Sequence, residues 1–77
     1  MVVAFLLVNI GLGAEDTVVD EMLKIANVKE AYVTYGVYDI VARVEAESLE
    51  QLKEIVTTEI KRIHNVRATL ALLAAES

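Results

Sequence analysis

The spacing of apolar and polar positions changes several times along the chain, and each change predicts a boundary between elements. Residues 2–10 are apolar and largely β-branched, which indicates a buried strand, and Gly11 and Gly13 end it. From Glu15 onward the apolar residues fall at helical spacing, and acidic side chains favour this helix start. We expect the helix to end at Asn27.

The middle of the chain alternates as strands do. Residues 31–35 predict one strand, Gly36 a turn, and the run from Tyr38 or Asp39 to about Glu45 a second strand. The two strands are expected to form a hairpin.

A second helix and a last strand complete the pattern. Ser48 and Gln51 have capping-box spacing, in which the serine hydroxyl accepts from the third helical amide and the glutamine reaches back. The apolar stripe that follows is Leu49, Leu52, Ile55, Val56, Ile60 and Ile63. Residues 66–73 predict the final strand.

The two halves of the chain resemble each other at a constant offset. The segment VVA at Val2–Ala4 resembles IVA at Ile40–Ala42, and IANVK at Ile25–Lys29 resembles IHNVR at Ile63–Arg67. Two such βαβ halves predict an α+β fold, a ferredoxin-like βαββαβ sandwich with two helices on one face of a four-stranded antiparallel sheet.

That fold leaves one sheet face open. If Ile40, Ala42 and Val44 face the helices, the offset places Val3, Phe5 and Leu7 on the opposite face. A chain of 77 residues without cysteine has no disulfide to support a small core. We therefore expect a dimer through the sheet.

Charge and hydropathy exclude several functions. A net charge of −5 opposes a phosphate backbone, so no direct nucleic-acid binding is expected. The longest apolar run is too short to cross a bilayer, and no basic segment precedes it as in a signal peptide. We expect a cytoplasmic protein with no membrane segment.

Enzymatic and metal-binding patterns are weak. His64, the only histidine, is expected at a helix end without a catalytic role. Gly11 and Gly13 lack the third glycine of a dinucleotide fingerprint, and the acidic residues of the first helix have no metal-ligand spacing. No cofactor or metal is predicted.

The segment YGVYD at Tyr35–Asp39 has more chemical content. Gly36 alone is explained by a turn that needs positive φ. Asp39 begins an otherwise apolar strand, so its carboxylate requires a cationic or amide donor, and turn amides beside it suit an anion. A zwitterion would complement both groups, although an aspartate beside a turn often caps its own backbone.

These residues resemble the effector-binding (RAM) domain of the Lrp/AsnC, or feast/famine, transcription regulators. The resemblance covers nearly the whole chain, residues 1–77 as a single domain, and includes AFLLVNI, the Gly-x-Tyr-Asp pattern, LEQLKEIV and IHNVRATLALL. It implies the same fold, dimers through the sheet, rings of dimers, and amino acids bound between dimers. Because the chain starts at the first strand of the sensor, we expect no helix-turn-helix domain and possible association with full-length regulators.

The resemblance also assigns roles to residues. Gly36, Val37 and Tyr38 match the turn that meets the effector backbone, and Asp39 matches the aspartate that pairs with its amino group. Thr69 matches the first threonine of a Thr-x-Thr pattern whose second position is Ala71 here. Tyr35 either walls the pocket or packs on the sheet.

Three functions follow from this sequence. The first is an amino-acid-binding module that oligomerises and modulates transcription. The second is a small dimeric enzyme, because dimeric ferredoxin-like barrels also host enzymes. The space between helices and sheet, however, offers mainly aliphatic side chains from which to build an active site. The third is a structural oligomer, in which Asp39 bonds only its own chain.

Overall fold

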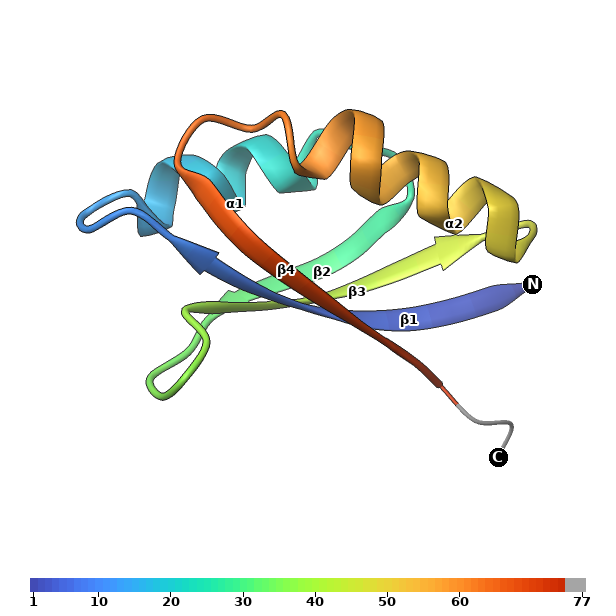
Figure 1. Ribbon diagram of the computed structural model, residues 1–77, viewed down its shortest axis with the longest axis horizontal. Coiled ribbons are helices and arrows are strands. Elements are labelled where there is room, and N and C mark those ends of the chain that lie inside the picture. The colour runs from blue at the N-terminus through green and yellow to red at the C-terminus, as the bar shows by residue number, and fades with distance from the viewer. Residues whose placement is uncertain (75–77) are drawn as a thin grey trace.

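A computed structural model describes residues 1–74 as one sheet with helices on one side (Figure 1). The elements are β1 (Val2–Ile10), α1 (Glu15–Leu23), β2 (Val28–Val33), β3 (Ile40–Ala46), α2 (Leu49–Ile55), η1 (Val56–Ile60) and β4 (Val66–Leu73). The antiparallel sheet has the order β2-β3-β1-β4, which confirms the ferredoxin-like prediction. The last three residues of the predicted domain, 75–77, lie outside the described residues.

The internal repeat is visible in the element boundaries. β1 and β3 begin at Val2 and Ile40, and β2 and β4 begin at Val28 and Val66, which is the same offset. Each half therefore supplies one central and one edge strand to the sheet.

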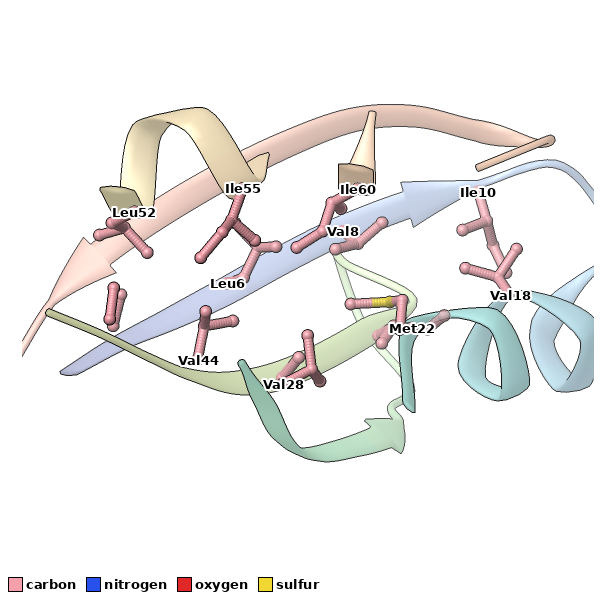
Figure 2. Close-up of a cluster of buried hydrophobic side chains, with 14 of the residues drawn as sticks. Leu6, Val8, Ile10, Val18, Met22, Val28, Val44, Leu52, Ile55 and Ile60 are labelled. Atoms are coloured by element: carbon pink, nitrogen blue, oxygen red, sulfur yellow. The ribbon is translucent and has the colours of Figure 1, made fainter. Parts of the chain in front are cut away.

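The hydrophobic core lies between the sheet and the helices. Strands β1 and β3 bury every second side chain on this side, as the alternation predicts. Figure 2 shows Leu52 and Ile55 of α2 pointing toward Leu6 and its neighbours in the sheet. Leu6, Met22 and Ile60 are fully buried, so truncating one of them to alanine would cost about 2–5 kcal/mol.

The opposite side of the sheet, the open face, carries no helix (Figure 1). Val3, Phe5 and Leu7 lie on it as predicted, and Phe5 is 42% exposed. In the pairing with β4, Phe5 lies opposite Leu72 and Leu7 opposite Leu70. Tyr32 and Val41 extend this apolar surface across β2 and β3.

The first helix ends earlier than predicted, at Leu23 instead of Asn27. The backbone tightens here, because the Ile25 amide donates to the Met22 carbonyl at 3.0 Å. Asn27 instead bonds to β3: its carbonyl accepts from the Glu45 amide and its side-chain amide donates to the Glu45 carbonyl, each at 2.9 Å. Pairing with the sheet thus replaces the last helical turn.

The second helix begins as predicted but changes its winding. The Gln51 amide donates to Ser48 Oγ at 3.1 Å, whereas the Gln51 side chain accepts from the Glu47 amide and not from Ser48. Residues 56–60 form a π-helical turn. There the Thr57 and Thr58 hydroxyls donate to carbonyls one turn earlier, a competition that weakens regular α-helical pairing.

One residue of the predicted apolar stripe is not buried. Leu49 is 44% exposed and lies in the first turn of α2.

Within residues 1–74, no helix has the length and apolar character needed to span a membrane.

Candidate ligand-binding site

The segment with the Gly-x-Tyr-Asp pattern is a six-residue loop, 34–39, between β2 and β3. The strands were predicted to approach Gly36 more closely, but β2 ends at Val33 and β3 begins at Ile40. Thr34 explains the wider loop, because its amide donates to the Asp39 carbonyl and its hydroxyl to the Tyr38 carbonyl, each at 2.8 Å. These two bonds close the loop at its base.

Gly36 has φ +153°, a conformation that side chains disfavour. A Cβ atom added there would meet nothing within 4 Å, so the requirement for glycine is conformational and not steric. The predicted need for a positive φ at Gly36 is confirmed.

The tip of the loop projects from the molecule. Tyr35 is fully exposed and Val37 is 85% exposed. Tyr35 lies beyond the end of β2, so the alternative interpretation, that it packs on the sheet of its own chain, is wrong.

Asp39 joins this loop to β1. Its Oδ2 atom accepts from the Ile10 amide at 2.9 Å, and its own amide donates to the Val8 carbonyl at 3.0 Å. The residue is half-buried. The Ile10 amide thus supplies the donor that this carboxylate was expected to require.

Thr69 lies at the same end of the sheet, on the far side of β1. It pairs with Val8, whose other neighbour is Ile40, the residue after Asp39. Adjacent strands are about 4.8 Å apart, so the two backbones are separated by roughly 10 Å. Figure 1 shows the 34–39 loop and the start of β4 at this end.

Within residues 1–74, the hollow that Thr69 lines does not include the 34–39 loop. Thr69 lines a surface hollow of about 440 Å³. Its lining residues are Lys61, Val66, Arg67, Ala68 and Thr69, and no residue of the 34–39 loop is among them. The structure therefore brings Asp39 and Thr69 to one end of the sheet without joining them.

Ala71, the departure from Thr-x-Thr, opens onto a different hollow. It pairs with Leu6 and contributes to an apolar groove of about 350 Å³ between α2 and β4. The other lining residues are Leu49, Leu52, Lys53, Val56, Thr57 and Leu73.

Lys61 and Arg67 were not predicted as site residues. The sequence did carry a signal: residues 61–67 contain three basic side chains and no acidic one, in a chain of net charge −5. Only the fold shows that Lys61, at the end of η1, and Arg67, in β4, face the same hollow.

His64 is exposed and lines another surface hollow, of about 370 Å³, with Glu21, Ile25, Glu59, Arg62 and Ile63. Among the described residues, no group of three or more His, Cys, Asp or Glu side chains is arranged to hold a metal ion.

The structure is a small α+β domain with one uncovered sheet face, and its 34–39 loop carries the Gly-x-Tyr-Asp pattern. Comparison with known proteins gives this class a family: residues 3–77 match the Lrp/AsnC ligand binding domain, and the chain belongs to that family. A search of curated proteins gave no match.

Solved structures agree with this assignment. The chain is 36% identical to FFRP-DM1, covering 97% of this chain and 100% of that one with a TM-score of 0.92. Escherichia coli AsnC shares the fold at 22% identity and a TM-score of 0.93, over 99% of this chain and 52% of its own. The Neisseria meningitidis transcriptional regulator NMB0573, solved as a complex with L-Met, shares it at 16% identity and a TM-score of 0.89, over 97% and 50%. The chain thus spans about half of each of these two regulators.

Proposed function

We propose that this protein binds a free amino acid at the 34–39 loop and modulates transcription by associating with full-length Lrp/AsnC regulators in the cytoplasm. The observation that carries the proposal is the position of Asp39, at the Gly-x-Tyr-Asp corner of a chain whose residues 3–77 match a ligand-binding family. The complex of NMB0573 with L-Met supports an amino acid as the class of ligand.

The 34–39 loop offers partners for both charged groups of an amino acid. Asp39 uses Oδ2 for the Ile10 amide, and Oδ1 is the atom proposed to accept from the ammonium group of the ligand. The amides of Gly36, Val37 and Tyr38 are proposed to bind its carboxylate. Thr69 would contribute its hydroxyl from across β1.

Self-association is the second part of the proposal. The open face would pack against the same face of a second copy, and dimers would assemble into a ring. Fully exposed Tyr35 would then wall the ligand between neighbouring dimers. A ligand at such a boundary favours the assembly that binds it better, in proportion to its differential affinity.

The direct test is the melting temperature of the protein with each of the twenty amino acids at millimolar concentration. A ligand at 100 times its Kd stabilises the native state by about 2.7 kcal/mol. We expect one or a few amino acids to raise the melting temperature selectively, and Asp39→Ala to abolish the rise. A response that survives in Asp39→Ala would place the ligand elsewhere.

Two alternatives make different predictions. For a structural oligomer, the bond from Ile10 to Asp39 would be the whole role of the carboxylate, and no amino acid would change stability. For an enzyme, the chemistry would fall in one of the surface hollows, and substrate turnover would be detected. The family description as a ligand-binding domain favours the binding module over both.

A further inference from the structure

The hollow beside Thr69 brings together two cations from different elements. Lys61 follows η1, and Arg67 lies near the start of β4. Within residues 1–74, the ion pairs of basic side chains involve Lys24 and Arg43, not Lys61 or Arg67. The lining contains no acidic residue, and Glu59, in η1, lines a different hollow with His64.

Arg67 occupies this position because of a β-bulge. Asn9 pairs with Ala68 and Ile10 pairs with Val66, so Arg67 is the extra residue of β4. A bulged residue is left out of the ladder and its side chain is redirected. At this break in the pairing, Arg67 lines the hollow.

The backbone before this bulge is fixed by the loop after β1. Asn65 has φ +75°, and its carbonyl accepts from the Gly11 amide at 2.9 Å. The Val66 amide donates to the Ile63 carbonyl at 3.1 Å. These hydrogen bonds fix the segment that joins Lys61 to Arg67.

The internal repeat supplies a comparison within the same molecule. Val28 pairs with Val44 and Glu30 with Arg43, so Lys29 is the bulged residue of β2, equivalent to Arg67. The hollow that Lys29 lines also contains Glu45 and Glu47, which supply negative charge. The Arg67 hollow has no acidic residue in its lining and contains a second cation, Lys61.

We propose that the hollow lined by Lys61, Val66, Arg67, Ala68 and Thr69 binds the carboxylate or phosphate group of a small molecule. Two cations in a concave surface bind an anion because its charge relieves their mutual repulsion, and guanidinium suits planar or tetrahedral oxyanions. The Thr69 hydroxyl adds a donor. This site goes beyond the proposed amino-acid site: the two share Thr69, but the cations Lys61 and Arg67 belong to this hollow alone, across β1 from Asp39.

The test is titration calorimetry with inorganic phosphate and, separately, with acetate, at pH 7.5 and an ionic strength held constant with sodium chloride. Wild type is compared with Lys61→Gln and Arg67→Gln. Lys29→Gln and Arg62→Gln are the matched controls, because each removes one positive charge outside this hollow. Melting temperatures measured without added ligand test whether each variant folds.

We expect saturable binding of at least one anion to wild type and to both controls, weakened about tenfold or more in Lys61→Gln and in Arg67→Gln. Phosphate binding without acetate binding would identify a phosphate group as the ligand, and comparable acetate binding a carboxylate. The proposal is overturned if neither anion saturates, or if the controls lose as much affinity as the two site variants.

The same titration separates this site from the amino-acid site. Asp39→Ala is expected to leave anion binding unchanged, because Asp39 does not line the hollow. Loss of anion binding in Asp39→Ala would contradict the assignment of two separate sites.

Discussion

The Asp39 carboxylate accepts a hydrogen bond from the Ile10 amide across 2.9 Å. This bond holds the end of the 34–39 loop against the end of β1, where the Val8 carbonyl also accepts from the Asp39 amide. The side chain thus has a structural role in its own chain besides the proposed contact with a ligand. Alanine would remove both roles at once, so a second substitution is needed to separate them.

Asp39→Asn is that substitution. Its side-chain oxygen can still accept from the Ile10 amide, so we expect the free energy of unfolding to change by less than about 0.5 kcal/mol. Asp39→Ala leaves the amide without its partner and is expected to cost about 1–2 kcal/mol. Both variants should lose the amino-acid response, because neither carries the negative charge. Urea denaturation and melting curves with ligand measure the two effects; a full ligand response in Asp39→Asn would exclude an ionic contact.

The fold could be predicted from the sequence because period-2 alternation and the internal repeat point to the same architecture. β1 and β4 have the predicted bounds, 2–10 and 66–73. Errors arose where hydrogen bonds to distant residues decide a boundary. Asn27 lies beyond the end of α1 and hydrogen-bonds to Glu45. Thr34 closes a loop at a position where the strand pattern predicted more strand.

The site was harder to predict than the fold. Tyr35–Asp39 form one contiguous segment, so the glycine and the carboxylate could be found by inspection. The hollow of Lys61 and Arg67 depends on a one-residue bulge in the pairing of β4 with β1. A register shift of this kind depends on tertiary pairing and leaves no mark in hydrophobic periodicity.

Gly11 and Asn65 are predicted to be energetically coupled. A Cβ atom on Gly11 would lie 2.9 Å from Asn65 Oδ1, so Gly11→Ala is expected to destabilise the fold by about 1 kcal/mol. Asn65→Gly removes that side chain and suits φ +75°, so the same alanine should cost little in its background. A double-mutant cycle from urea denaturation should give a coupling of about 0.5–1 kcal/mol. Strict additivity would show that the Asn65 side chain moves aside freely.

Glu30 is predicted to titrate below its ordinary pKa of 4.5. Hydrogen bonds from the Arg43 guanidinium, then from the Tyr32 hydroxyl, and the charge of Arg43 lower this pKa. Because the pKa is lower in the folded state, the stabilisation is present above about pH 4.5 and is lost as the pH falls through the folded-state value.

Carbon-13 NMR of the Glu30 carboxyl group measures this pKa directly. Arg43→Gln should raise this pKa toward 4.5. Glu30→Gln should be less stable than wild type at neutral pH, and the difference in free energy of unfolding should shrink as the pH falls through the folded-state pKa. Lys24→Gln is a suitable control, because Lys24 pairs with Glu21 on α1. An unchanged Glu30 pKa in Arg43→Gln would show that the pair does not persist in solution.

Phe5 is predicted to decide the oligomeric state. It lies on the open face, 42% exposed in the single chain and paired with Leu72 in β4 and Arg43 in β3, so lysine at this position adds one cross-strand charge repulsion to the monomer but no buried charge. In a dimer through the sheet the same lysine would be buried against apolar side chains, which costs more than about 2 kcal/mol. We therefore expect wild type to sediment as a dimer or larger and Phe5→Lys as a monomer of 8.5 kDa. Leu49→Lys is the matched control, because Leu49 has a similar exposure of 44% but lies on the helical side. If Leu49→Lys dissociates the assembly and Phe5→Lys does not, the helical side is the interface and the open face must be explained in another way.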